Sequence, residues 1–153
     1  MKRILQLGLS LLLVFATSQF AAAVDQATGK HKVLFLAGKP SHGYGAHDHL
    51  AGCMLLAKSL DESGLPIECE VYHYDWPTDP KMFDGVDCVV MYGDGGPGHM
   101  VNAHLDELDA LAKKGVGIVC LHYAVEVPKG PAGDKFLDWI GGYFETNWSV
   151  NPH

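Results

Sequence analysis

The chain has 153 residues, 48% of them hydrophobic, and it carries 11 basic side chains against 18 acidic ones. This length and composition suit one folded domain. The excess of acidic side chains argues against nucleic acid as a partner, because nucleic-acid-binding proteins bind phosphates through patches of lysine and arginine.

The first 23 residues have the pattern of a secretory signal peptide. A basic start precedes an apolar run over residues 4–16, and three alanines at 21–23 follow it. The run is shorter than the roughly 20 residues that span a bilayer, so we expect cleavage after Ala23, export to the periplasm or beyond the cell, and no stable membrane span after processing. The mature domain, residues 24–153, then has no arginine and nine lysines, which favours a neutral polyhydroxylated ligand over a phosphate-rich one.

The rest of the chain alternates short apolar segments with amphipathic ones. The apolar segments predict strands at 32–38, 67–74, 85–93 and 116–122, and the amphipathic ones predict helices at 47–64, 101–115 and 134–142. Near-continuous apolar strands separated by helices are typical of a parallel sheet, because each crossover lays a helix over one of its faces. The sequence therefore predicts a three-layer α/β domain.

Two of the predicted helices have clear apolar faces. The residues expected to point inward are Leu50, Met54, Ala57 and Leu60 in the first helix and Leu105, Leu108 and Leu111 in the second. Asp48 is a candidate N-cap of the first. We expect no closing element after residue 142, so the domain looks truncated at its C-terminus.

The four cysteines lie in different predicted elements. Cys88 and Cys120 fall within apolar strands and Cys53 within the first helix, where a thiol packs as a small core residue. An exported chain with an even number of cysteines also suits disulfides. We expect free buried thiols and leave Cys69 open.

Polar side chains concentrate in three segments that follow predicted strands, 38–49, 93–99 and 122–126. Ligands of open parallel sheets bind beyond the carboxyl ends of the strands, so these segments are the first place to look for a site. The titratable groups in them are His42, His47, Asp48, His49, Asp94, His99, His122 and Glu126. Some residues of these segments also have a purely structural interpretation. In that interpretation His122 is a core histidine, and Gly95 and Gly96 are residues of a tight turn.

Clustered histidines and carboxylates also suit zinc. The spacing of His42, His47 and His49 does not match the helical HExxH pattern. His47 and His49 also cannot face the same way if the helix has already begun at residue 47. We therefore predict no metal and no other cofactor, and keep a divalent ion such as zinc as the less favoured alternative.

A cysteine nucleophile is a further alternative. Cys120 precedes His122 by two residues, so both side chains are expected on one side of the strand. An activated thiolate needs exposure and an electropositive setting, however, and Cys120 lies in the strand interior. We therefore disfavour thiol chemistry.

Four segments resemble the ThuA-like (trehalose-utilisation) family, whose fold is similar to class I glutamine amidotransferases. They are VLFLAGKPSHGYGAHDH (33–49), MYGDGGPGH (91–99), GVGIVCLHYAVE (115–126) and FLDWIGGYFETNW (136–148). The resemblance covers about residues 32–153 and implies a flavodoxin-like parallel sheet. In that superfamily a catalytic cysteine occupies the turn after a core strand, and ThuA-like proteins have a histidine there, which His122 matches.

The resemblance also implies a function. The family is implicated in bacterial breakdown of trehalose and related disaccharides through oxidised keto-sugars, and its members usually continue past the point where this chain ends. We therefore expect an exported protein that acts on a saccharide as a hydrolase or lyase. The expected catalytic residues are His122 and Glu126, and the expected substrate-binding residues are His42, Asp94, Gly95, Gly96, His99 and Tyr123.

Two rival hypotheses remain at this point. One is a catalytically silent carbohydrate-binding or interaction module with an amidotransferase-like shell. The other is a Cys120-dependent amidotransferase, which we favour least. The sequence leaves the oligomeric state open.

Overall fold

The structure is a computed structural model that describes residues 29–148, so the expected signal peptide lies outside the described residues. The chain divides into two units, 1–30 and 31–153, and the fold below belongs to the second. None of the helices in the described part of the chain is long and apolar enough to cross a membrane.

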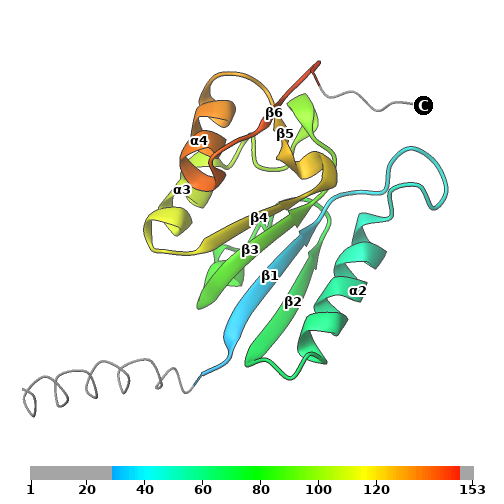
Figure 1. Cartoon of the computed structure of the whole chain (residues 1–153), viewed down its shortest axis with the longest axis vertical. Coiled ribbons are helices and arrows are strands. Elements are labelled where there is room, and N and C mark those ends of the chain that lie inside the picture. Colours follow the sequence, from blue (N-terminus) through cyan, green and yellow to red (C-terminus); the bar gives the residue numbers. More distant parts are fainter. Residues whose placement is uncertain (1–28, 149–153) are drawn as a thin grey trace, which may run out of the picture. The chain divides into compact units, whose positions relative to one another are not determined.

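A four-stranded parallel sheet forms the centre of the fold (Figure 1). Its strands are β1 (His31–Ala37), β2 (Ile67–His73), β3 (Val86–Tyr92) and β4 (Gly117–Leu121), in the order β2-β1-β3-β4. All four predicted strands are confirmed, with ends within one residue of the expected ones. The order is the flavodoxin-like one, in which the chain leaves β1 for one side of the sheet and then returns to its other side at β3.

Helices cover both faces of this sheet, so the predicted three-layer α/β architecture is confirmed. Helix α2 (His49–Asp61) lies on one face, and α3 (Leu105–Lys113) and α4 (Pro131–Ile140) lie on the other. Short 3₁₀ turns complete the connections at η1 (Pro80–Phe83), η2 (Gly96–Gly98) and η3 (His122–Val125).

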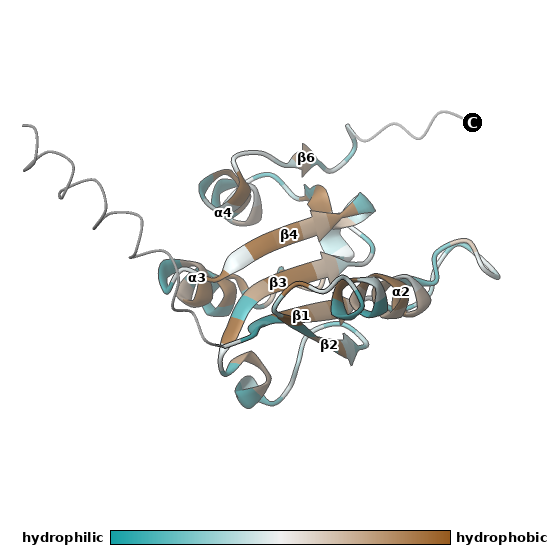
Figure 2. Ribbon diagram, turned by 60° about the horizontal axis from the view of Figure 1, so that its bottom comes forward, coloured by the Kyte–Doolittle hydropathy of each residue, from teal (hydrophilic) through white to brown (hydrophobic). Residues whose placement is uncertain are grey.

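Alternate residues of the strands supply two separate cores. Leu34 and Leu36 of β1 pack with Leu108 and Phe136 on the α3 and α4 side. Their neighbours Val33 and Phe35 pack on the α2 side, because successive side chains of a strand point to opposite faces. Figure 2 shows β3 and β4 as largely apolar strands at the centre of the fold.

The inward face of α2 differs from the predicted one at a single position. Leu50, Ala57 and Leu60 pack on the sheet side as expected, but Met54 is 58% exposed. Cys53 takes the buried position instead. The helix lies close to the sheet: a β-carbon at Gly52 would stand only 2.6 Å from the Tyr92 ring, so small residues occupy the contact.

The C-terminal part contains more structure than the sequence predicted. Helix α4 begins at Pro131, three residues before the expected start, because proline suits the first helical position. The two-residue strands β5 (Glu126–Val127) and β6 (Phe144–Glu145) then pair in parallel. Strands this short carry no periodicity in the sequence, so we had expected no such element.

All four cysteines are free thiols, as predicted for Cys53, Cys88 and Cys120, and Cys69, which the sequence left open, is free as well. Only Cys53 is fully buried, and the other three are partly buried. Burial raises the pKa of Cys53 and of Cys69 to about 11. These thiols therefore remain protonated near neutral pH.

Candidate functional site

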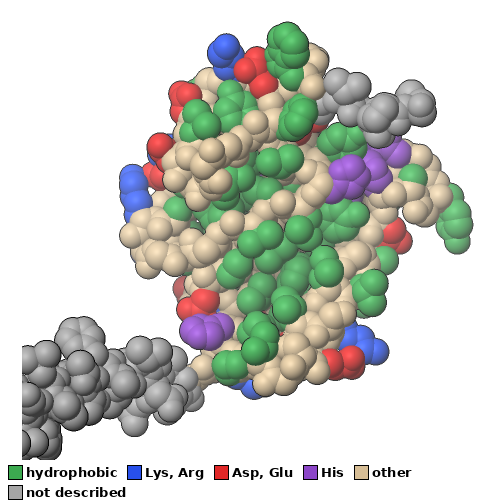
Figure 3. All heavy atoms as spheres, viewed as in Figure 1, with side chains coloured by type: hydrophobic (Ala, Val, Ile, Leu, Met, Phe, Trp, Pro, Cys, Tyr) green, Lys and Arg blue, Asp and Glu red, His purple; other side chains and the backbone are tan. Residues whose placement is uncertain are grey.

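A cluster of histidines lies at the carboxyl ends of the strands, next to the switch point between β1 and β3. The loop after β1, the turn after β3 and the turn after β4 contribute to it. Figure 3 shows histidine side chains gathered on the surface at this end of the sheet. Topological switch points of this kind are where open α/β sheets bind ligands.

The loop after β1 closes on itself through an antiparallel bridge between Ser41 and His47. The Ser41 N–H donates to the His47 carbonyl at 3.3 Å. His42 and Gly43, which follow Ser41, both have positive φ angles, of 61° and 96°. This turn brings the rings of His42 and His47 together, with centroids 4.4 Å apart.

Asp94, the first polar residue after β3, lies at the centre of the cluster. Its Oδ1 accepts a hydrogen bond from the Ser41 hydroxyl at 2.8 Å. The same oxygen lies 3.5 Å from His47 Nδ1 and 3.9 Å from the Nε2 atoms of both His42 and His49. One carboxylate therefore connects three imidazoles from the β1 loop.

His49 is the buried member of this group, with 1% of its side chain exposed. Its Nδ1 lies 2.8 Å from the Lys39 carbonyl oxygen, to which it donates, and its ring meets the Tyr92 ring edge-on at 4.8 Å. These contacts fix the ring, so Nε2 faces Asp94.

Both His47 and His49 face Asp94, because the condition under which we expected them to diverge, a helix that has already begun at residue 47, is not met. The helix begins at His49 and Asp48 is its N-cap, accepting from the Ala51 N–H at 3.0 Å. His47 thus precedes the helix, and helical spacing does not apply to the pair. The predicted capping role of Asp48 is confirmed.

His122 begins the η3 turn directly after β4 and has a φ of 57°. A positive φ in a residue other than glycine is uncommon, and such strained positions cluster at functional sites. The His122 ring lies 5.0 Å from the His47 ring and stacks on Tyr123 at 4.4 Å. Tyr123 also lies 5.7 Å from His47, so the β4 turn faces the β1 loop.

Cys120 does not share this environment. Strand alternation ends at Leu121, so the expectation that Cys120 and His122 point to one side is wrong. Cys120 packs into the core on the α3 and α4 side, and burial raises the pKa of its thiol to about 12. This setting opposes a thiolate nucleophile.

His99 stands apart from the cluster, although the sequence placed it in the pocket. It is 3% exposed, and both ring nitrogens are held by backbone. Nε2 lies 2.9 Å from the Ala124 carbonyl oxygen, and Nδ1 accepts from the Val101 N–H at 3.1 Å. Burial lowers the pKa of this ring, although the bond to Ala124 opposes the shift. His99 therefore has a structural role.

Gly95, Gly96 and Glu126 form a close contact between two turns beside the cluster. A β-carbon at Gly95 would lie 2.4 Å from the Tyr123 carbonyl oxygen and 2.7 Å from Glu126 Cβ. Gly96 has a φ of 67°, which also favours glycine. The glycines let the β3 turn approach the β4 turn, so they position Asp94 and His122 relative to each other.

The structure thus brings together His42, Asp94, His122 and Tyr123 from the predicted set. It adds Ser41, His47 and His49, which that set left out. Histidine content alone pointed to His47 and His49, but the helical argument set them aside. No sequence signal marks Ser41, because its partner is 53 residues away along the chain.

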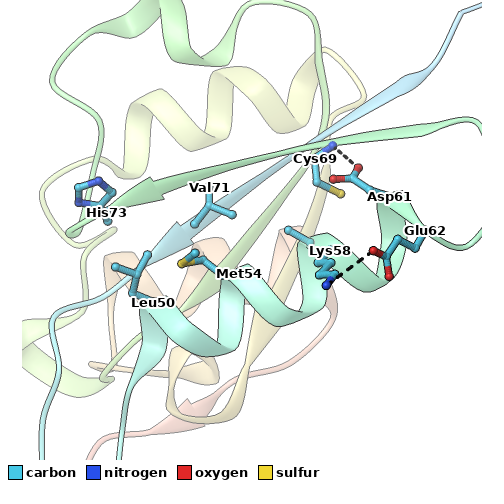
Figure 4. Close-up of a pocket in the computed structure, with 9 residues that line it drawn as sticks. Leu50, Met54, Lys58, Asp61, Glu62, Cys69, Val71 and His73 are labelled. Carbon is cyan, nitrogen blue, oxygen red and sulfur yellow. Dashed lines mark hydrogen bonds and ion pairs between the residues drawn. The ribbon is translucent and has the colours of Figure 1, made fainter.

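Two pockets open onto the cluster. One is lined by residues of the β1 loop, including Ser41, Tyr44 and His47, and the other reaches Asp94 beside Lys39 and Gly98. A more apolar pocket lies elsewhere, between α2 and β2, where Leu50, Met54 and Val71 point toward one another (Figure 4). It contains none of the cluster residues, and we take the histidine cluster as the candidate functional site because the titratable groups converge there.

The cluster has three chemical capacities. Its imidazoles can donate and accept protons, its carboxylate and hydroxyl can bind ligand hydroxyl groups, and its nitrogens and Asp94 can bind a metal ion. Comparisons of the chain with models of protein families, with curated proteins and with solved structures found no match.

Proposed function

We propose that this protein is an exported ThuA-like domain protein that acts on a neutral saccharide of the trehalose or keto-disaccharide type at the histidine cluster. In this proposal His122 is the general acid or base, and His42, Asp94 and Tyr123 bind the substrate. The rival proposal, a silent saccharide-binding module, uses the same pocket without proton transfer.

The observation that carries the proposal is the 5.0 Å approach of the His122 ring to the His47 ring, across the switch point of the sheet. The His47 Nδ1 atom lies 3.5 Å from Asp94 Oδ1 there. A core histidine would have its nitrogens satisfied by backbone, as His99 has. The strand-to-turn position of His122, with its positive φ, also matches the place where the resemblance puts the reaction centre.

The side chains of the cluster favour a neutral ligand with many hydroxyl groups. Imidazoles, the Ser41 hydroxyl and the Asp94 carboxylate all form hydrogen bonds with hydroxyl groups. The nearby cation, Lys39, is paired with Asp75 at 2.8 Å rather than directed at Asp94. An aromatic ring such as that of Tyr123, which is partly buried beside His122, suits contact with the apolar face of a sugar.

Proton transfer is the step that the cluster supports best. A histidine can accept a proton from a sugar hydroxyl or donate one to a leaving oxygen, and this contributes roughly 10²-fold to 10⁴-fold to a rate. Ser41, hydrogen-bonded to Asp94 and lying 3.1 Å from His47 Nδ1, connects the carboxylate to the ring that faces His122. Glu126, first expected to be catalytic, is proposed here as a positioning residue because it packs against the glycine turn.

The test is a ligand panel on the purified protein. Trehalose, its 3-keto derivative and trehalose phosphate are titrated by calorimetry, and the mixtures are analysed for products by mass spectrometry. The proposal expects binding of the neutral sugars in preference to the phosphate, with turnover of at least one. Binding without turnover supports the silent module, and no binding of any sugar contradicts both.

A further inference from the structure

We propose that His42, His47 and Asp94 form a binding site for one divalent transition-metal ion, with Zn²⁺ the best match. Among the residues that the structure describes, these three offer ligand atoms that all lie within 4.8 Å of one another. The site is argued from its own geometry and does not depend on the identity of the sugar.

The ligand atoms are close to the spacing that zinc needs. Bonds of about 2.0–2.1 Å in a tetrahedral arrangement place neighbouring ligand atoms roughly 3.3 Å apart. His47 Nδ1 and His42 Nε2 lie 3.5 Å and 3.9 Å from Asp94 Oδ1. The His42 side chain is 61% exposed and precedes Gly43, so a small rotation of this ring closes the remaining gap.

The surrounding contacts hold the carboxylate as a metal site requires. Metal-binding carboxylates are usually hydrogen-bonded by a second layer of residues, and Ser41 donates to Asp94 Oδ1 at 2.8 Å. His49 Nδ1–H donates to the Lys39 carbonyl, which holds this buried ring in place with its Nε2 3.9 Å from the same Asp94 oxygen.

His47 must change tautomer to bind the ion through Nδ1. Ser41 gives its single hydroxyl hydrogen to Asp94, so its 3.1 Å contact with His47 Nδ1 requires a hydrogen on that nitrogen. Metal binding at Nδ1 needs the tautomer in which the neutral ring carries its hydrogen on Nε2, so that the lone pair of Nδ1 is offered to the ion. The Ser41 bond to Asp94 remains intact.

The donor set defines the class of ion. Two imidazoles and one carboxylate suit zinc and neighbouring transition metals, whereas magnesium and calcium prefer sites made of oxygen. Three protein ligands leave one position for water or a substrate hydroxyl, which is the arrangement of catalytic rather than structural zinc sites. The His122 ring lies 5.0 Å from the ring of His47, one of the proposed ligands.

The experiment measures metal binding in the absence of sugar, so its failure is separate from that of the proposed function. The protein is purified without an affinity tag, treated with EDTA and titrated with Zn²⁺ by calorimetry, and Co²⁺ is added to a second sample for visible absorption. We expect one equivalent of Zn²⁺ and a tetrahedral Co²⁺ spectrum. Much less than one equivalent would overturn the proposal.

Four variants locate the ion. Asp94→Asn and His42→Gln should weaken Zn²⁺ binding roughly 100-fold or more, and Ser41→Ala about 10-fold to 100-fold. His31→Gln is the matched control, because it removes an exposed histidine that is also near a carboxylate, that of Asp87 at 3.4 Å. It should bind Zn²⁺ as the wild type does. Equal affinity in all four would mean adventitious binding to surface histidines.

His42→Gln also keeps the test decisive if Asp94→Asn fails to fold. The residue lies in an exposed loop, so this variant should keep the wild-type circular dichroism spectrum and urea midpoint even if Asp94→Asn does not. A folded His42→Gln protein with unchanged Zn²⁺ affinity would remove His42 from the ligand set and contradict the proposal.

Discussion

His99 and the histidine cluster lie after strands of the same sheet, yet their surroundings differ in kind. Both nitrogens of His99 are held by backbone groups within the core. The cluster rings instead face a carboxylate and one another at the surface. Backbone partners fix one tautomer and exclude ligands, whereas side-chain partners from separate loops leave nitrogens available for proton transfer or metal binding. Burial and partners, rather than residue type, separate the two roles.

The largest expected effect is on turnover, from a change inside the cluster. His122→Asn keeps similar size and one hydrogen-bonding edge but removes the imidazole. Turnover of the keto-disaccharide should fall by about 10²-fold to 10⁴-fold, and the free energy of unfolding should change by less than about 1 kcal/mol. Steady-state kinetics and urea unfolding measure the two. A large loss of stability with normal turnover would make His122 a packing residue like His99.

The opposite result is expected for His99. His99→Leu fills similar space but leaves the Ala124 carbonyl and the Val101 N–H without the ring, and each unsatisfied buried group costs about 1–3 kcal/mol. We expect the free energy of unfolding to fall by about 2–4 kcal/mol while Zn²⁺ affinity stays unchanged. Urea unfolding and calorimetry test this. If a folded His99→Leu protein lost Zn²⁺ binding, His99 would contribute to the histidine cluster, which would contradict our distinction between the two.

A pH series sharpens the same contrast. Burial holds the pKa of His99 below its ordinary value of 6.5, so the unfolded chain binds more protons than the folded one in acid. The stability that His99 contributes is complete above about pH 6.5 and is lost as the pH falls. The difference in unfolding free energy between wild type and His99→Leu should therefore shrink from pH 7.5 to pH 5. A constant difference would show that His99 does not titrate as its burial requires.

The smallest effect is expected at Cys120. Burial raises the pKa of its thiol to about 12, so it stays protonated and should resist alkylation by iodoacetamide at pH 8 in the folded protein. Cys120→Ala should cost about 1 kcal/mol of stability and leave turnover unchanged. If this variant folds but loses all activity, the result would support the Cys120-dependent amidotransferase mechanism and contradict the proposed role of His122 as general acid or base.

The sequence predicted the sheet well because β1, β3 and β4 are largely apolar, whereas the edge strand β2 alternates polar and apolar residues. It predicted helix ends less closely: α4 starts at Pro131, three residues early, and α3 starts at Leu105, four residues later than the apolar pattern suggested. The pair of two-residue strands, β5 and β6, was missed because their pairing depends on contacts between distant segments.

The membership of the cluster was predicted in part. His42, Asp94, His122 and Tyr123 gather there because each lies next to the end of a strand, and parallel strands end at one edge. Ser41, His47 and His49 needed the structure, since the helix start and the loop bridge decide where they point. His99 follows a strand as well, and only its burial and backbone partners remove it from the pocket.

The sequence by itself determined the α/β class, the strands and the edge of the sheet where the histidines gather, because hydrophobic periodicity and chain order are local properties. Tertiary structure alone decided which histidines meet. A hydrogen bond between Ser41 and Asp94 spans 53 residues, and the direction of a ring depends on the loop that carries it and on the groups packed around it. Interactions of that range leave no pattern in neighbouring residues, so the cluster around Asp94 appears only when the chain is folded.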